Sequence, residues 1–297
     1  MKDMAPTLSI IIPSFNTAAL TRSCLQSILT RPGRTTIEII VVDNGSRDGT
    51  VELIRRELPQ VTVIAEPVNR GYGAACNLGA GHAHGEFLLF LNSDTQMLDG
   101  TLDSIAEAFR REPSPAAVAC RELDADGHTT WSCFELQTLR AGISFLTGYR
   151  LFQGEGNRYR MVDWDRQSDR WVDNVSISMF AWAIRREMFE QLGGFDEQLF
   201  LYCEAQDVGI RLQKIGGRTL FCAAARIIHL SGRSSIEIGR WGRRRQWVES
   251  FVYVRKKYGL SVSAWLDRIV LYPFLLMWWV GSAAGLGRRR NPVDPQA

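Results

Sequence analysis

This chain of 297 residues has little that would mark a secreted, disulfide-bonded or nucleic-acid-binding protein. Its six cysteines include no Cys-X-X-Cys pair, and several lie in apolar segments, which favours reduced thiols. The 35 basic and 32 acidic residues leave a net charge of +3, which is too small to indicate nucleic acid as a partner. The start at Met1-Lys2-Asp3 lacks the apolar core of a signal peptide, so we expect the catalytic part to stay in the cytoplasm.

Two further absences narrow the class of protein. No internal repeat is visible, and no Gly-X-Gly-X-X-Gly motif follows the first apolar segment, which argues against a nicotinamide-binding enzyme. The composition, with 45% hydrophobic and 23% charged residues, is ordinary for a globular protein and excludes a disordered chain. The length predicts one sizeable domain with appendages.

Short apolar segments alternate with amphipathic ones over the first 120 residues, which is typical of β-α units that build a mainly parallel sheet. The amphipathic segments are expected to be helices, the first of them capped by Thr17. Residues 121–170 keep no period, so we expect loops and short strands there. The predicted strands are Leu8 to Ile12, Ile37 to Asp43, Val61 to Ala65, Glu86 to Leu91, Ala116 to Cys120 and Arg226 to Leu230, and the ordered segment Val175 to Ile184 precedes helices at Arg186 to Gln191 and near Asp207 to Ile215.

The C-terminal part has a different character. Ile269 to Gly287 carries no charged residue and is followed by Arg288 to Arg290, and its length lies in the lower range for a membrane span. Two interpretations remain open, a membrane anchor and a hydrophobic helix packed on the catalytic domain. We therefore divide the chain into a catalytic domain at 1–240 and a helical, membrane-associating segment at 241–297, in which Arg243 to Arg245 could also contact a membrane surface.

Polar residues directly follow three of the predicted strands. An open parallel sheet places its ligand crevice at the carboxyl ends of its strands, so these residues are candidates for a binding site. Each segment alone has an ordinary explanation as a turn or a helix cap. Their joint occurrence is more informative, and the segments are Pro13-Ser14-Phe15-Asn16, Asp43-Asn44-Gly45-Ser46 and Asn92-Ser93-Asp94.

With these segments in this order and at this spacing, the chain resembles family 2 glycosyltransferases with the GT-A nucleotide-sugar-binding fold, especially their bacterial rhamnosyltransferase-like branch. The resemblance implies an α/β fold with a mainly parallel mixed sheet flanked by helices, followed here by the C-terminal hydrophobic helical segment. It spans roughly residues 8–235 and rests on Ser9 to Asn16, Val41 to Ser46 with Asp48 and Gly49, Asn69 to Gly73 with Asn77 and Gly79, Leu91 to Thr95, Arg185 to Glu187, Gly193 to Glu197, Glu204 with Asp207, and His229 with Gly232 and Ser234.

The resemblance implies which residues bind substrates. The Asp43 carboxylate is expected to accept a hydrogen bond from a pyrimidine, because uracil and thymine offer an imide N–H. The segment Asn69 to Gly79 is similar to the family's sugar-nucleotide loop, although a glycine-rich helix start needed only for packing is the alternative. Part of the acceptor side is expected at Gly193 to Glu197. The substrate-binding set is thus Pro13, Asn16, Asp43, Asn69, Gly71, Asn77, Asn92, Ser93, Gly194 and Phe195.

A divalent metal, Mg²⁺ or Mn²⁺, is also implied. Asn92-Ser93-Asp94 is similar to the family's Asp-X-Asp motif with Asn at its first position, which makes Asp94 the firmer ligand. A hard cation held by oxygen ligands suits a diphosphate leaving group. His229 fits as a further ligand, and an ordinary histidine at a strand end is the alternative.

The general base is the point at which this chain departs from the family. Members commonly have two adjacent acids and a third acid two residues later, whereas this chain reads Glu204-Ala205-Gln206-Asp207. We expect Glu204 to be the base and Asp207 to hold the site together, because residues three apart share a helical face. The alternative is that both acids only favour a helix N-terminus electrostatically.

These expectations describe an inverting glycosyltransferase that uses a nucleotide-diphosphate sugar, with dTDP-rhamnose the first candidate, and a polysaccharide or lipid-linked glycan precursor as acceptor. It would work on the cytoplasmic side of the bacterial inner membrane, held peripherally or by a single C-terminal anchor. A transferase that uses a uridine-diphosphate sugar is one alternative. A binding protein without turnover is the other, suggested by Ala205.

Overall fold

The computed structural model describes residues 6–31, 33–130, 133–135, 168–172, 175–177, 180–230, 239–261 and 264–283. Most of the stretch 121–170, for which loops and short strands are predicted, lies outside these residues. Gly232, Ser234 and the segment 284–290 lie outside them as well.

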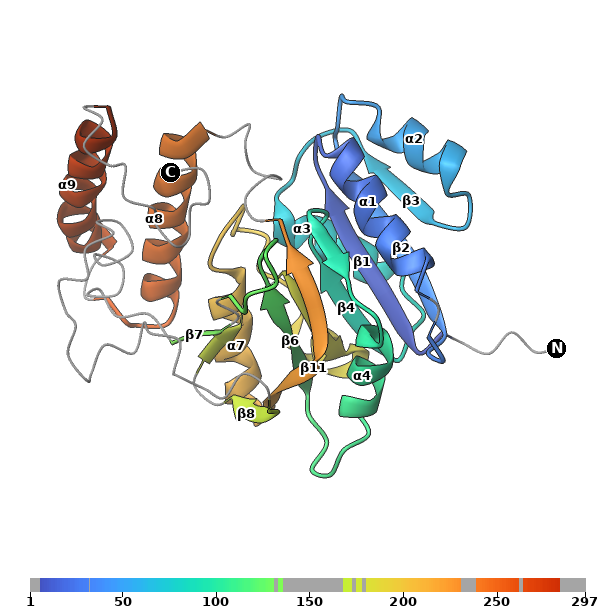
Figure 1. Cartoon of the computed structure of the whole chain (residues 1–297). Coiled ribbons are helices and arrows are strands. Elements are labelled where there is room, and N and C mark those ends of the chain that lie inside the picture. Colours follow the sequence, from blue (N-terminus) through green and yellow to red (C-terminus); the bar gives the residue numbers. More distant parts are fainter. Residues whose placement is uncertain are drawn as a thin grey trace.

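The described residues form a nine-stranded sheet in the order β3-β2-β1-β4-β10-β6-β11-β5, with β8 beside β11 (Figure 1). Strands β1 to β4 are parallel to one another, whereas β10 runs antiparallel to both β4 and β6. A separate pair joins β7 and β9. The bounds are β1 (Leu8–Ser14), β2 (Ile37–Asn44), β3 (Thr62–Glu66), β4 (Phe87–Leu91), β5 (Thr95–Met97), β6 (Ala117–Leu123), β7 (Cys133–Glu135), β8 (Arg170–Val172), β9 (Val175–Ile177), β10 (Ala181–Arg185) and β11 (Thr219–His229).

Helices cover both faces of this sheet, because its central strands are apolar on both sides. In β1, Ile10 and Ile12 pack into the core on one face and Ile11 into the core on the other. The first face is covered by α1 (Ala18–Leu29), α2 (Thr50–Glu57) and α4 (Thr101–Ala108), and the second by α3 (Tyr72–Gly81), α6 (Arg186–Leu192) and α7 (Glu204–Lys214). The predicted α/β architecture with a mixed sheet flanked by helices is confirmed, but the sheet is not mainly parallel, because β10, β5 and β8 pair with their neighbours in antiparallel fashion.

The start of α1 differs from the prediction. Thr17 makes no capping hydrogen bond through its side chain. The backbone N–H of Ala18 instead donates to Asp48 Oδ2 at 2.8 Å, while Asp48 Oδ1 accepts the N–H of Thr50 at the start of α2. The Asp48 carboxylate therefore caps the N-termini of both α1 and α2, and Thr17 is not the cap of α1.

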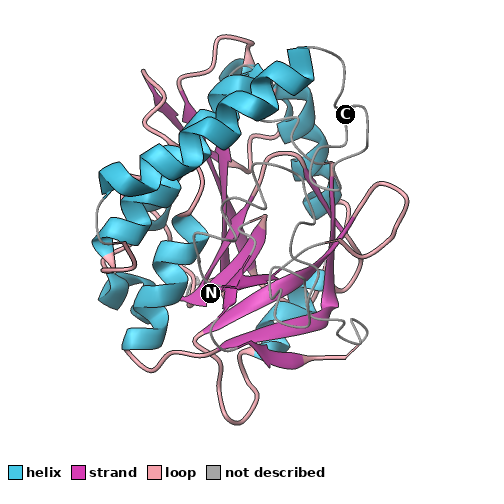
Figure 2. Ribbon diagram, turned by 90° about the vertical axis from the view of Figure 1, so that its left-hand side faces the viewer, coloured by secondary structure: helices cyan, strands magenta, loops and turns pink. Residues whose placement is uncertain are grey.

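The C-terminal helices α8 (Gly239–Lys257) and α9 (Ala264–Ala283) lie together at one end of the molecule, and Figure 2 looks at the molecule from that side. Trp247 and Phe251 of α8 pack with Leu271 and Leu275 of α9 in a third core. Leu199, from the loop before α7, belongs to the same core. The inner face of α9 is thus packed on the protein.

A single membrane-spanning segment is not supported, since no helix in the described part of the chain combines the length and apolarity that a span requires. The helix begins at Ala264, before the uncharged stretch, and carries the charged residues Asp267 and Arg268 near its start. Asp267 is buried against Arg255 at 2.9 Å, and Arg268 pairs with Glu249 at 2.7 Å. The prediction of a hydrophobic helix packed on the catalytic domain describes this segment better than the predicted anchor.

Candidate functional site

The three polar segments after the strands meet at one edge of the sheet. Strand β1 pairs in parallel with both β2 and β4, and Ser14 lies opposite Asp43 in the register. The turn from β4 to β5 then carries Asn92, Ser93 and Asp94 to the same edge. The predicted convergence is therefore present in the fold.

Asp43 has one oxygen available for a ligand. Its Oδ2 accepts the backbone N–H of Ser46 at 2.9 Å, which shapes the turn after β2. Its Oδ1 is buried, and among the described residues no hydrogen-bond partner reaches it. A buried acceptor without a partner is costly, so a ligand N–H at this point would be favourable.

Asn16 and Ser93, two predicted substrate contacts, make hydrogen bonds within the protein. Asn16 has a φ of 50° and its Oδ1 accepts the N–H of Arg47 at 2.7 Å, which ties the ends of β1 and β2 together. Ser93 is buried with its hydroxyl 3.1 Å from that of Thr17. Pro13 and Asn92 are partly exposed at this edge and remain open to a ligand.

Asn44 shapes the start of the sugar-nucleotide loop. Its Nδ2 donates to Asn69 Oδ1 and to the carbonyl of Gly71, both at 3.0 Å, and its Oδ1 accepts the N–H of Arg70. Gly71 has a φ of +93°, and a Cβ there would lie 2.5 Å from the carbonyl oxygen of Phe200, so only glycine fits. Asn69 thus acts within the loop, and Asn44, which the sequence indicated only as part of the polar segment after β2, shapes that loop.

Asn77, Gly194 and Phe195 connect this loop to the acceptor-side loop. Asn77 Oδ1 accepts the N–H of Phe195 at 2.8 Å, and Asn77 Nδ2 donates to the carbonyl of Phe195 at 3.0 Å. The Phe195 ring is buried 4.9 Å from that of Phe90, and a Cβ on Gly194 would lie 2.6 Å from Asn77 Oδ1. These residues therefore join the two loops by packing and hydrogen bonds within the protein, and their predicted contact with substrate stays a prediction.

Asp94 and His229 meet across the pairing of β5 with β11. His229 lies opposite Thr95 in the register, and the N–H of Leu230 donates to the Asp94 carbonyl at 2.9 Å. His229 Nε2 lies 3.3 Å from Asp94 Oδ1, and both side chains are buried. Two ligand atoms with metal bonds of about 2.1 Å can be no more than about 4.2 Å apart, so this pair fits a divalent cation.

The His229 ring is held on several sides. Its Nδ1 lies 2.8 Å from Glu122 Oε1, and the ring stacks on Phe180 with centroids 3.8 Å apart. Burial by itself would lower the pKa of His229, but the hydrogen bonds with Asp94 and Glu122 outweigh it and raise that pKa to about 9. Glu122 was not singled out in the sequence, because its proximity to His229 depends on the pairing of β6 with β11.

Glu204 begins α7 and keeps an available oxygen. The backbone N–H groups of Glu204 and Tyr202 donate to its carboxylate, while Oε1 is buried and has no partner in the described part of the chain. Burial raises the pKa of Glu204 to about 7. Burial raises the pKa of Tyr72 well above its usual value, and the charges of Glu204 and Asp94 add to that rise.

Asp207 is surrounded by donors. Its carboxylate accepts from Arg211 Nε at 2.8 Å and from both Lys257 Nζ and Tyr258 Oη at 2.6 Å. Lys257 also contacts Asp196 at 2.6 Å. Asp207 therefore joins α7 to the end of α8, which agrees with a structural role for this acid.

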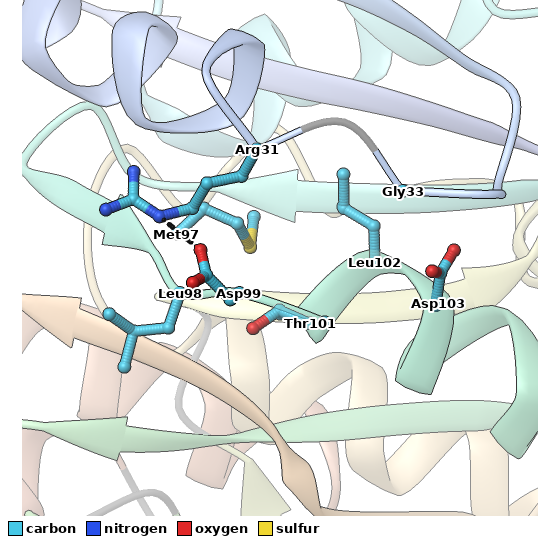
Figure 3. A pocket seen from close by; sticks show the side chains of 9 residues that line it. Arg31, Gly33, Met97, Leu98, Asp99, Thr101, Leu102 and Asp103 are labelled. Atoms are coloured by element: carbon cyan, nitrogen blue, oxygen red, sulfur yellow. Dashed lines mark ion pairs between the residues drawn. The ribbon is translucent and has the colours of Figure 1, made fainter.

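One surface pocket lies elsewhere, between the end of α1, β5 and the start of α4 (Figure 3). Arg31 pairs there with Asp99 at 2.8 Å, and Asp103 accepts the N–H of Arg34 at 3.0 Å. The predicted site residues are absent from the described residues that line it. The pocket is thus distinct from the edge that carries Asp43, Asp94 and Glu204.

Comparison with known proteins agrees with this geometry. Residues 9–193 match the sequence model described as Glycosyl transferase family 2. The N-acetylglucosaminyl-diphospho-decaprenol L-rhamnosyltransferase of Mycobacterium tuberculosis is 30% identical over 211 residues, which cover 67% of this chain and 68% of that protein. The O-antigen biosynthesis protein RfbC of Myxococcus xanthus is 31% identical over 229 residues, which cover 75% of this chain and 17% of that protein.

Solved structures share the fold. One is the mannosyltransferase PcManGT from Pyrobaculum calidifontis, solved in complex with GDP-Man and Mn²⁺. It matches with a TM-score of 0.60 at 19% identity, over 98% of this chain and 78% of the mannosyltransferase chain. S. aureus TarS 1-349 has a TM-score of 0.55 at 16% identity and covers 92% of this chain and 71% of its own. From the family match over most of the chain and the relatives at 30% identity or more, the chain is a glycosyltransferase that belongs to family 2, in its rhamnosyltransferase-like branch.

Proposed function

We propose that this enzyme inverts the anomeric centre as it transfers a sugar from a pyrimidine-nucleotide diphosphate to a glycan or lipid-linked acceptor. The observation that carries the proposal is the placement of a buried acceptor on Asp43, the Asp94–His229 pair and the carboxylate of Glu204 at or beside one edge of the sheet. Asp43 suits the nucleobase, the Asp94–His229 pair suits a cation on the diphosphate, and Glu204 suits the acceptor hydroxyl.

The donor side would be read by Asp43. Its unpartnered Oδ1 suits the imide N–H of thymine or uracil, and the rhamnosyltransferase relative makes dTDP-rhamnose the first candidate. Asp94 and His229 would hold a divalent cation, for which Mn²⁺ is favoured over Mg²⁺ because imidazole is a softer ligand than oxygen. When bound, such a cation neutralises the charge that develops on the diphosphate leaving group.

Glu204 would be the general base. Its free Oε1 takes the proton of the acceptor hydroxyl as that oxygen attacks the anomeric carbon, and the bond from carbon to the diphosphate oxygen breaks on the opposite face. Burial holds the pKa of Glu204 at about 7, so the carboxylate is a stronger base than an exposed one and still ionises near neutral pH. Asp207, already saturated with donors, would keep the start of α7 in place.

A panel of donors tests the proposal. Purified full-length chain is assayed with Mn²⁺, a decaprenyl-diphosphate N-acetylglucosamine acceptor, and dTDP-rhamnose, UDP-glucose, UDP-N-acetylglucosamine or GDP-mannose, and the released nucleoside diphosphate is measured. We expect acceptor-dependent release from dTDP-rhamnose. Preference for a uridine-diphosphate sugar would favour the alternative donor, and preference for GDP-mannose would contradict the role given to Asp43.

A second candidate is a nucleotide-sugar-binding protein without turnover, which the alanine at position 205 favours. It predicts tight binding of the donor nucleotide with no release from any donor. Among the described residues nothing hydrogen-bonds Oε1 of Glu204, which supports the enzyme, because a carboxylate retained only for structure would be expected to have its oxygens satisfied.

Asp43→Ala is expected to weaken binding of dTDP or UDP by roughly tenfold or more, with a smaller effect on turnover at saturating donor, since a hydrogen bond to a charged group is lost. Isothermal titration measures the affinity. Asp43→Asn keeps an oxygen for the Ser46 N–H but turns an amide N–H₂ toward the base, so it should weaken binding as well. Unchanged affinity in both variants would remove Asp43 from the nucleotide pocket.

Peripheral contact with the cytoplasmic face of the inner membrane is also proposed. Trp265, Ile269 and Leu276 are exposed and, at spacings of four and seven, share the face of α9 opposite Leu271 and Leu275. The mycobacterial relative, by its name, acts on a decaprenol-linked acceptor, which supports a lipid surface as the partner of this face.

Replacing these three side chains by serine should reduce flotation with phosphatidylglycerol vesicles by at least about tenfold, because each removes exposed apolar surface that lipid would cover. The matched control replaces Val68 and Ile215, which are exposed and apolar on other elements. Equal flotation of both variants and the wild type would contradict contact through α9.

A further inference from the structure

We infer that Glu122 is a positioning residue that prepares His229 to bind the divalent cation, an inference that rests on the proposed metal site. The two ring nitrogens of His229 each face a carboxylate, with Nε2 3.3 Å from Asp94 Oδ1 and Nδ1 2.8 Å from Glu122 Oε1. A cation held by Asp94 must use Nε2, because that is the nitrogen beside it. Glu122 bonds the ring nitrogen on the far side from Asp94, so its proposed effect on the cation is transmitted through the ring.

The hydrogen bond selects the form of the ring that binds metal. A neutral imidazole carries one proton, and a lone pair is available on Nε2 only when that proton sits on Nδ1. Glu122 Oε1 accepts the Nδ1 proton and so stabilises this tautomer. A carboxylate on the far side of a histidine ligand also increases the basicity of the ligating nitrogen.

The fold also fixes the orientation of the ring. Glu122 lies opposite Ile227 in the register between β6 and β11, two residues before His229. Phe180 covers one ring face at 3.8 Å, which restricts rotation about the His229 side chain. Glu122 is only 4% exposed, and burying a carboxylate is costly unless it is paired. An acid at this strand position is therefore explained by its bond to the ring.

Mn²⁺ affinity of the purified full chain, measured by electron paramagnetic resonance, tests the inference without any sugar transfer. Glu122→Met should weaken Mn²⁺ binding by about 10- to 100-fold, whereas Glu122→Gln, which can still accept from Nδ1, should recover most of that loss. In a His229→Ala background, Glu122→Met should have no further effect. Unchanged affinity in Glu122→Met, or an equal loss in the His229→Ala background, would overturn the inference.

A second measurement needs no folded variant at position 122. With Mg²⁺ bound to the ¹⁵N-histidine-labelled wild type, the His229 signals, assigned by their loss in His229→Ala, should show a proton on Nδ1. A proton on Nε2 would overturn the inference. If the wild type binds Mn²⁺ no better than His229→Ala, the metal assignment itself fails, and the donor panel shows separately whether transfer still occurs.

Discussion

Asp94→Ala is expected to abolish sugar transfer while the protein still folds. Asp94 lies in the turn after β4 and supplies the carboxylate beside His229 Nε2. Without it, the proposed cation would lose its firmest ligand and could no longer neutralise the diphosphate as it leaves. We expect activity to fall to the background of the assay, with Mn²⁺ affinity reduced in the same protein.

Asp99→Ala is the matched control, because Asp99 lies five residues further along, is exposed and pairs only with Arg31 in the contacts described above. Its activity should equal that of the wild type. Circular dichroism should show the same secondary structure for both variants. Near-normal turnover of Asp94→Ala at saturating Mn²⁺ would refute the metal assignment.

Glu204→Gln is expected to bind donor normally and to lose about 10²- to 10⁴-fold in kcat, the usual effect of removing a general base. The matched control is Glu190→Gln, an exposed acid on α6. If Asp207→Asn is more damaging to the chemical step and Glu204→Gln is mild, the two roles are reversed. The stability of Asp207→Asn must be measured by thermal unfolding, because the wild-type Asp207 carboxylate accepts hydrogen bonds from Lys257 and Tyr258.

The pH dependence offers an independent check on Glu204. Burial raises its pKa to about 7, and only the carboxylate can accept the acceptor proton. The wild-type kcat should therefore rise through pH 7 and level off above it, and this rise should be missing from Glu204→Gln. Because burial disfavours the ionised form in the folded state, stability is lost as pH rises from about 4.5 to about 7 and does not fall further above that range. Glu204→Gln should thus be at least as stable as the wild type at pH 8, unlike a variant with a structural defect.

The sheet could be predicted because its signals are local. The apolar runs Ile10 to Ile12 and Ile39 to Val42 are continuous, and polar residues follow them closely in the chain. The cap of α1 could not be predicted, because it is Asp48, thirty residues from Ala18 in the chain, that accepts the Ala18 N–H once β1 and β2 pair. The neighbouring Thr17 does not cap the helix. The role of Asn44 and the importance of Glu122 could not be predicted for the same reason, since their partners depend on how the strands pair.

The C-terminal segment shows another limit. Charge-free residues from Ile269 onward satisfy a membrane core and a protein core equally, so composition cannot choose between them. In the structure, Leu271 and Leu275 pack against apolar residues of α8, and Asp267 forms an ion pair with Arg255. These contacts identify the segment as part of a protein core. Likewise, Glu204 and Asp207 look equivalent in the sequence, and only the donors around Asp207 separate them.

Lys257 donates hydrogen bonds to both Asp196 and Asp207. This arrangement limits where segments can be exchanged between relatives to change acceptor preference. A chimera that replaces the chain after position 240 would bring a foreign side chain to position 257 and leave two native carboxylates, one of them fully buried, facing it. Asp207 would keep Arg211 but lose Lys257, and removing one partner of a buried charge is destabilising. The interchangeable module therefore begins before Asp196, so that both acids travel with their lysine.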